Sequence, residues 1–249
     1  MKKIVIIGAN DFQNQLIVKA KEMGFETHVF AWADGSVGER TADYFYPISI
    51  MEVDKILEKC KEIQPDAVTT IASDLANITV SKVAKGLNLP ANSLECITLS
   101  TNKYAMREAF IKAGIATPKF YKVDRVEAYL FSLGLPLIVK PTDRSGSRAI
   151  TKVLDFDELN IAIKEAVDQS FEKQAIVEEF IEGDEYSYEA ISYHGKHTCL
   201  AITKKYTTGS PHFIETGHKQ PCDLSPKMLE QVHYVMSRAL DALKITDGA

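Results

Sequence analysis

Short apolar runs alternate with helical patterns over residues 1–100. Ile4–Ile7 is continuously apolar, as expected for a strand that is covered on both faces. Residues 53–60 carry apolar side chains at i, i+3, i+4 and i+7, which indicates a helix with one buried face. The other elements expected here are strands at 26–32 and 66–73 and helices at 12–24 and 75–86. This βαβαβα order predicts an α/β domain with a doubly wound parallel sheet.

After residue 100 the pattern changes to that of an α+β domain at 101–249. Two apolar runs, 135–140 and 149–154, flank a polar loop, and a capping-box spacing from Asp155 to Glu158 predicts a helix that begins at Asp155. Residues 174–205 predict three antiparallel strands with a turn at His194–Lys196. The last helix is expected from Ser225 to about Leu243, with these residues facing inward: Met228, Val232, Val235, Ala239 and Leu243.

The composition and charge of the chain indicate which kinds of binding partner and which cellular compartment are expected. The chain has 249 residues, 45% of them hydrophobic, and a formal charge of -5, which disfavours binding to nucleic acid or to an anionic membrane. No apolar run reaches the roughly 18 residues of a membrane span, and the run before Gly8 is too short for a signal peptide. The four cysteines are widely spaced, which is typical of free thiols in a reducing compartment. We therefore expect a cytoplasmic protein.

Two patterns in the sequence raise the alternatives of a zinc site and a dinucleotide site. His194, His197 and Cys199 have metal-ligand chemistry, but the Gly-Lys pair between the histidines favours a hairpin tip over a zinc site. The turn after the first strand has Gly8 but carries Asn10 and Gln13 where a dinucleotide fingerprint has its second and third glycines. We therefore do not expect bound NAD, although the following helix N-terminus could receive a substrate carboxylate.

Several separated pieces would suit a nucleoside triphosphate. Lys103 begins a predicted helix, and Lys140 ends a predicted strand. The loop Asp143–Arg148 offers backbone amides, hydroxyls and arginines, which are groups that bind phosphate oxygens. Glu185 begins a strand, where a carboxylate can accept both hydroxyls of a ribose. An ordinary solvated surface charge remains the alternative for each lysine and for Glu185.

The order and spacing of these pieces resemble the ATP-grasp superfamily. The similar branch contains carboxylate–amine ligases, including the large subunit of carbamoyl-phosphate synthase and the amino-acid ligases. The segments that carry the resemblance are NKYAMREAFIKAGIATPKF, LIVKPTDRSGSRAI, VEEFIEGDEYSYEA and FIETGHKQP, together with the strand–Gly8 start. The resemblance implies a pre-ATP-grasp domain at 1–100 and an ATP-grasp domain at 101–249 with a lid subdomain at about 119–185.

The resemblance also implies roles for individual residues. Lys103 and Lys140 would contact the α- and β-phosphates of ATP, and backbone groups of Glu178 and Ile181 would bracket the adenine. Glu185 would hold the ribose, and Glu215 and His218 would face the acceptor substrate. The remaining residues implied at the nucleotide are Ser145, Gly146 and Ser147 in the lid loop and Glu179 and Phe180 beside the adenine.

This sequence departs from the superfamily pattern at the metal site. In the superfamily, acidic ligands for two Mg²⁺ ions lie on the last strands, and here only Glu215 is available, since the sequence ends at Ile245–Ala249. We therefore expect either a shortened form of a ligase that joins a carboxylate to an amine, or a nucleotide-binding module without efficient chemistry. Apolar surface near Met228, Val232 and Met236 would then favour a homo-oligomer.

Overall fold

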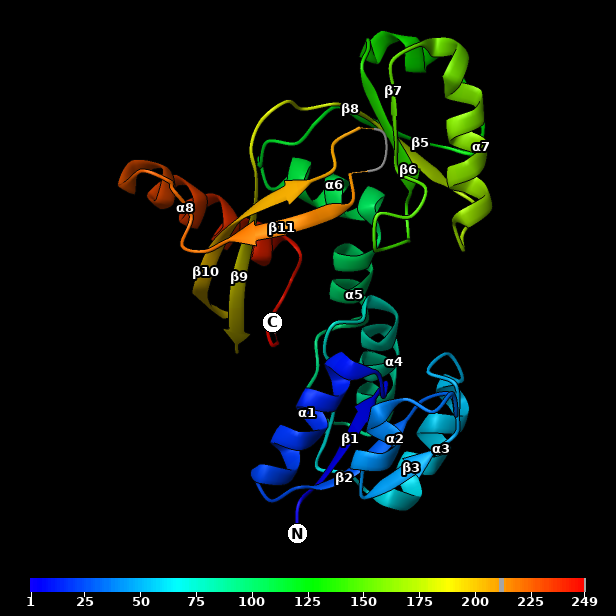
Figure 1. Cartoon of the computed structure of the whole chain (residues 1–249), viewed down its shortest axis with the longest axis vertical. Helices are drawn as coiled ribbons and strands as arrows, with labels where there is room; N and C mark the ends of the chain where they lie inside the picture. Colours follow the sequence, from blue (N-terminus) through cyan, green and yellow to red (C-terminus); the bar gives the residue numbers. More distant parts are fainter. Residues whose placement is uncertain (211–212, 249) are drawn as a thin grey trace. The chain divides into compact units, whose positions relative to one another are not determined.

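The computed structural model describes residues 1–210 and 213–248, and the chain divides into two compact units, Met1–Ile97 and Thr98–Ala249 (Figure 1). Within the described residues, the first unit contains a parallel sheet and the second contains two antiparallel sheets. The expected mixed α/β class is thereby confirmed. None of the helices in the described part of the chain has the length and apolar character of a membrane span.

The first unit is a four-stranded parallel sheet in the order β3-β2-β1-β4. Its strands are β1 (Lys3–Ile7), β2 (Glu26–Phe30), β3 (Tyr44–Tyr46) and β4 (Ala67–Thr69). Its helices are α1 (Asp11–Glu22), α2 (Val37–Thr41), α3 (Val53–Ile63) and α4 (Asp74–Gly86), and α5 (Leu94–Thr101) leads into the second unit. The chain moves outward from β1 to β3 and then returns to β4, so the direction of winding reverses between β1 and β4. Such a reversal leaves a crevice at the carboxyl ends of the strands.

Side chains of β1 alternate between two cores because successive residues of a strand point to opposite faces. Val5 and Ile7 are fully buried in a cluster with Ile56 of α3. Ile6 is fully buried in a second cluster with Ile17 of α1. The continuous apolar run of the sequence therefore reflects a strand covered by helices on both faces, as predicted.

The second unit is built on a four-stranded antiparallel sheet in the order β5-β8-β6-β7. Its strands are β5 (Phe120–Val123), β6 (Leu137–Pro141), β7 (Thr151–Val153) and β8 (Ala175–Glu179). A separate three-stranded sheet contains β9 (Glu185–Tyr193), β10 (Lys196–Thr207) and β11 (Glu215–Lys219). The helices are α6 (Lys103–Lys112), η1 (Ala128–Leu133), η2 (Phe156–Glu158), α7 (Leu159–Gln169) and α8 (Pro226–Ala242).

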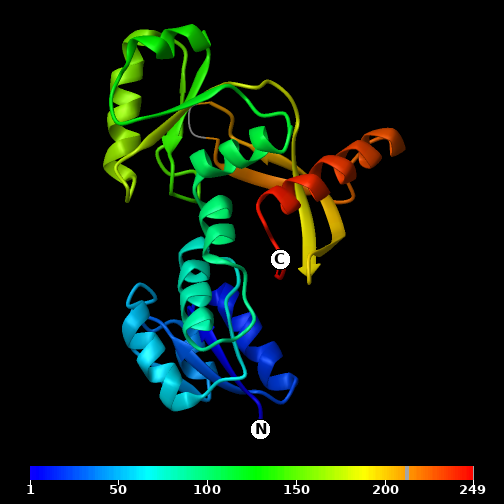
Figure 2. The same ribbon diagram turned by 180° about the vertical axis from the view of Figure 1, so that it is seen from behind.

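Helix α7 covers one face of the β5-β8-β6-β7 sheet (Figures 1 and 2). Val139 of β6 and Val177 of β8 are fully buried in a cluster with Leu159 and Ile163 of α7. Lys140 and Glu178 are the next residues of the same two strands, and therefore point to the opposite face. The sheet thus has one apolar face and one face that carries charged side chains.

Three expectations need correction. The strands of residues 174–205 form, but β8 pairs with β5 and β6 and lies outside the sheet of β9 and β10. The helix expected from Asp155 starts as the short η2 turn, because the Asp155 side chain accepts a hydrogen bond from Asp157 N, and α-helix begins at Leu159. In α8, Ala239 is buried as expected, whereas Met228 and Val235 are exposed.

Candidate nucleotide site

Glu178 is the centre of a charge cluster on the open face of the β5-β8-β6-β7 sheet. Its side chain is only 3% exposed, and it accepts a hydrogen bond from Arg107 Nε at 2.6 Å and one from the ammonium of Lys140. Burial raises the pKa of Glu178, but the charge of Lys140 and the hydrogen bond and charge of Arg107 outweigh burial, so the pKa lies below its usual value. Glu178 is therefore ionised at neutral pH and fixes both cations.

Strand register brings a further cation to the same face. Ile138 of β6 pairs with Glu178 on one side and with Lys152 of β7 on the other. Lys152 Nζ lies 3.6 Å from the ring centroid of Phe180, which follows directly after β8. Lys152 is therefore a third cation on the face where Lys140 and Arg107 contact Glu178. Such an excess of positive charge favours an anionic ligand.

Helix α6 supplies two of the basic side chains near this face. Asn102 caps the helix by accepting a hydrogen bond from Ala105 N at 3.0 Å. The backbone N–H of Lys103 donates to Thr142 O at 2.7 Å, and its ammonium donates to Arg144 O. Lys103 and Arg107 are four residues apart, so they lie on the same side of the helix. The N-terminus of α6 is thus attached to the start of the loop that follows β6.

The loop Asp143–Arg148 has a fixed start and an open tip. Asp143 accepts hydrogen bonds from Phe171 N at 3.1 Å and Glu172 N at 2.8 Å. Within the described residues, the backbone N–H groups of Ser145, Gly146, Ser147 and Arg148 donate no hydrogen bond. Unsatisfied amides in successive turn residues form a concave donor surface for phosphate oxygens. The loop therefore offers the kind of group that the sequence predicted there.

The segment after β8 has the features of an adenine-binding strand end. Phe180 N donates to Pro136 O at 3.1 Å, and Glu179 accepts a hydrogen bond from Lys119 N at 2.8 Å. Ile181 is 64% exposed, and within the described part of the chain neither of its backbone groups has a hydrogen-bond partner. An apolar side chain beside unsatisfied backbone groups suits a planar heterocycle that both donates and accepts.

Glu185 and Glu215 come together around a lysine that the sequence did not indicate. Lys205 Nζ lies 2.7 Å from Glu185 Oε1 and 2.7 Å from Glu215 Oε1, and its side chain is mostly buried. Burial lowers the pKa of Lys205, but the hydrogen bonds to both carboxylates outweigh it and raise the pKa above its usual value. His218 Nε2 lies 3.5 Å from Glu215 Oε2. The carboxylates of Glu185 and Glu215 are therefore both neutralised by the ammonium group of Lys205.

The arrangement around Glu215 does not fit a Mg²⁺ site as it stands. Mg²⁺ prefers several oxygen ligands, whereas Glu215 is paired with Lys205 and an imidazole. No group of three or more His, Cys, Asp or Glu side chains suited to a metal occurs among the described residues. For the zinc alternative, the ring of His197 already contacts Ser192 Oγ at 2.8 Å and Asp241 Oδ1 at 3.3 Å.

The turn after β1 in the first unit is filled by a side chain. Gln13 is 1% exposed, and a Cβ on Gly8 would lie 3.0 Å from the Cδ of Gln13. Asn10 accepts from Phe12 N at 3.0 Å and Gln13 N at 3.4 Å, which completes a capping box with Gln13. The N–H groups of Asn10, Phe12 and Gln13 are thus paired with side chains of the same turn.

Comparisons with known proteins agree with the sheet and loop geometry. Residues 133–249 match the family model of the ATP-grasp domain. The second unit carries an ATP-grasp domain. This match covers the face with Lys140, Lys152 and Glu178 and the open loop, so the ATP-grasp resemblance is confirmed.

Two relatives of this chain are a formyltransferase and a ligase by name. The chain is 26% identical to a formate-dependent phosphoribosylglycinamide formyltransferase of Prochlorococcus marinus, across 97% of this chain and 63% of that protein. It is 29% identical to an alanine–anticapsin ligase of Bacillus subtilis, across 79% of this chain and 46% of that protein. The chain thus spans less than two thirds of the length of these relatives.

Two solved structures show the same fold as this chain. An L-amino acid ligase from Bacillus licheniformis superposes with a TM-score of 0.86 at 24% identity, covering 100% of this chain and 61% of that one. A phosphoribosylglycinamide synthetase from Anaerococcus prevotii superposes with a TM-score of 0.76 at 26% identity, covering 98% and 62%. Both units of the chain therefore have counterparts in these proteins.

Proposed function

We propose that the chain binds ATP on the open face of the β5-β8-β6-β7 sheet. The observation that carries the proposal is the contact of Lys140 and Arg107 with Glu178, with Lys152 on the same face, beside a loop in which four successive amides donate no hydrogen bond within the described residues. Phosphates would contact Lys103, Lys140 and the amides of the loop, and the adenine would lie against Phe180 and Ile181. Glu185 would accept hydrogen bonds from the ribose once its contact with Lys205 adjusts.

We infer that the reaction is ATP-dependent ligation of a carboxylate to an amine. A carboxylate oxygen attacks the γ-phosphorus and ADP leaves, and the amine nitrogen then attacks the acyl carbon and expels phosphate. The residues of this chain would position ATP and neutralise its charge, and no covalent protein intermediate is needed. The names of the relatives support ligation in general, and they do not single out the carbamoyl-phosphate synthase reaction that the sequence suggested.

A second candidate function is a nucleotide-binding module without turnover. Its support is that Glu215 and its acidic neighbour Glu185 both pair with Lys205, and that no group of three or more metal-binding side chains occurs within the described residues. The two candidates share the nucleotide site and differ only in chemistry. ADP release with formate or amino acids as carboxylates, and ammonia or an amino acid as the amine, separates them.

The test of the nucleotide site is the affinity for ATP and ADP in the Lys140→Ala variant, measured by calorimetry with and without Mg²⁺. We expect binding to weaken by about 1–3 kcal/mol, the range for one lost charge-assisted hydrogen bond. Lys164→Ala is the matched control, because Lys164 is an exposed lysine of α7 that pairs with Asp168. Unchanged affinity in Lys140→Ala, or an equal loss in the control, would contradict the site.

A further inference from the structure

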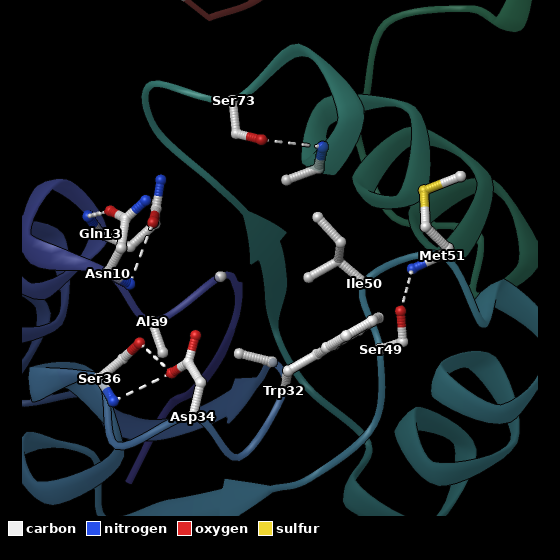
Figure 3. Close-up of a pocket in the computed structure, with 13 residues that line it drawn as sticks. Ala9, Asn10, Gln13, Trp32, Asp34, Ser36, Ser49, Ile50, Met51 and Ser73 are labelled. Carbon is white, nitrogen blue, oxygen red and sulfur yellow. Dashed lines mark hydrogen bonds between the residues drawn. The ribbon is translucent and has the colours of Figure 1, made fainter. Parts of the chain in front are cut away.

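A pocket of about 360 Å³ opens at the carboxyl edge of the parallel sheet in the first unit (Figure 3). It lies at the carboxyl ends of the paired strands β1 and β4, which is the crevice that the reversal of winding creates. Its lining combines Asn10 from the first turn, Trp32 and Asp34 from the segment after β2, Ile50 from the segment after β3, and Ser73 before α4. All of these residues belong to the first unit, far along the chain from the nucleotide face.

The lining is negatively charged. Among its described residues Asp34 is the one charged side chain, and the others are small, apolar or neutral polar groups. Ser36 donates to Asp34 Oδ1 from its backbone N–H at 3.0 Å and from its hydroxyl, and these hydrogen bonds hold the pKa of Asp34 below its usual value. Within the described residues nothing donates to Oδ2 of Asp34. The carboxylate is thus fixed, ionised and open on one side.

Trp32 supplies a large apolar surface to the same pocket. Its side chain is 67% exposed, although an indole of this size is ordinarily well buried. In Figure 3 the Trp32 side chain extends beside Ile50 toward Ser49, across the opening from Asn10 and Gln13. An exposed indole and a carboxylate in the lining of one pocket favour cations with an apolar frame, since the ring face attracts positive charge.

We propose that this pocket binds a small primary amine. The ammonium group would lie at Oδ2 of Asp34, and the apolar or aromatic part of the molecule would pack on Trp32 and Ile50. Serine hydroxyls at positions 49 and 73 add polar groups for a neighbouring hydroxyl or amide of the ligand. An anion is disfavoured here because Asp34 repels it and because the N–H groups of Phe12 and Gln13 already donate to Asn10. The proposal stands independently of ATP binding in the second unit.

The test uses three probes of one shape and different charge: benzylamine, benzyl alcohol and benzoate. Trp32 is the single tryptophan of the chain, so tryptophan fluorescence reports on this pocket alone. We expect saturable quenching or a shift of the emission by benzylamine, binding about tenfold weaker for benzyl alcohol, and no saturation by benzoate. Absence of a saturable response to benzylamine, or equal binding of benzoate, would overturn the proposal.

Variants make the test specific. Asp34→Asn keeps the shape of the side chain and should weaken benzylamine binding about tenfold, to the level of benzyl alcohol. Asp11→Asn removes one acidic charge outside the pocket lining and should leave binding unchanged. Trp32→Ala, followed by saturation-transfer NMR of benzylamine, should abolish the signal, with circular dichroism confirming the fold. Lys140→Ala should retain the fluorescence response, so failure of the ATP site and failure of this pocket are distinguishable.

Discussion

Glu178 is held between a lysine and an arginine at a position where water hardly reaches it. Glu178→Gln would leave the charges of Lys140 and Arg107 close together without a counter-ion. We expect the free energy of unfolding to fall by about 3 kcal/mol, as for other broken buried ion pairs. Urea denaturation at neutral pH measures this change.

Glu179→Gln is the matched control for that experiment. Glu179 is the next residue of β8, but it pairs with Lys119, whose side chain is 75% exposed. Exposed ion pairs contribute little, so the loss of stability should be much smaller than in Glu178→Gln. If both variants lost the same stability, the buried contacts of Glu178 would not be the cause.

At the same scale, the sequence predicted some site residues and missed others for physical reasons. Lys103 and Lys140 could be found because each stands at a recognisable end of an element. Arg107 was missed, although its spacing of four residues from Lys103 on a helix is a usable signal. Lys152 and Lys205 gave no local signal, because their roles depend on which strands pair and with what register.

At the scale of elements, Asp43 joins α1, β2 and β3 of the first unit. It accepts hydrogen bonds from Thr27 N at 2.9 Å and Thr27 Oγ1 at 2.8 Å and pairs with Lys21 at 2.7 Å. Burial raises the pKa of Asp43, but these partners outweigh it and lower the pKa from 3.8 to about 2. The stabilisation from Asp43 is therefore complete above about pH 4 and is lost as the pH falls through about 2.

The corresponding prediction concerns Asp43→Asn. At pH 7 we expect the first unit to lose about 1 kcal/mol, a value reduced for screening because the side chain of Asp43 is 34% exposed. Thermal unfolding from pH 7 down to pH 2 should show the variant and the natural protein converging at the acidic end. If the difference in stability between the variant and the natural protein grew toward low pH, the ionised carboxylate of Asp43 would not be the stabilising form.

We expect the loop after β6 to be locally mobile in the absence of nucleotide. Its tip, residues 145–148, has no backbone hydrogen-bond donation within the described residues, whereas β1 is paired on both sides. We expect amide hydrogens of the tip to exchange orders of magnitude faster than those of Ile4–Ile7 without nucleotide, and to slow on addition of ADP. Mass spectrometry of exchanged peptides measures both rates. Equal protection of the tip and β1 in the free protein would contradict the prediction.

Helices and strands could be predicted where the period of apolar residues identifies them. The assignment of a strand to a sheet could not be predicted, because it depends on tertiary pairing. Strands β1, β2 and β4 and helices α1, α3 and α4 follow from apolar runs and i, i+3, i+4 repeats, because each packs on its neighbours in sequence. Helix α2 was not predicted, since its five residues are too few to show a helical period. The placement of β8 did not follow, since alternation shows that a strand exists and not which sheet receives it. The short β3 (Tyr44–Tyr46) is only three residues long and has too few positions to show a period.

At the scale of the whole molecule, the two units can be followed separately through their thiols. Cys60 is fully buried in the first unit, and burial raises its pKa from 9.0 to about 12, while Cys222 of the second unit is half-buried. In the native protein, iodoacetamide should therefore modify Cys60 at least roughly a thousandfold more slowly than Cys222. Along a urea gradient, labelling of Cys60 should begin where the first unit unfolds.

We also propose that α8 takes part in self-association. Met228 is 48% exposed, Val235 is 43% exposed and Tyr234 is 64% exposed, so one helix presents several large apolar side chains to solvent. Contiguous apolar surface of this kind favours a protein contact. Sedimentation should show a concentration-dependent dimer that Val235→Lys weakens, with Glu230→Lys as the control on the same helix. A monomer at all concentrations would exclude the proposal.

The contact of Glu178 with Lys140 and Arg107 has a consequence for the lifetime of a bound nucleotide. These side chains keep their positions in the free protein, so a phosphate would arrive at a surface that needs little ordering, and association would be fast. The same carboxylate neutralises part of the positive charge and weakens the hold on the ligand, because the attraction scales with net charge. The expected outcome is a short residence time of ATP and ADP on the protein, which the proposed ligation would require between turnovers.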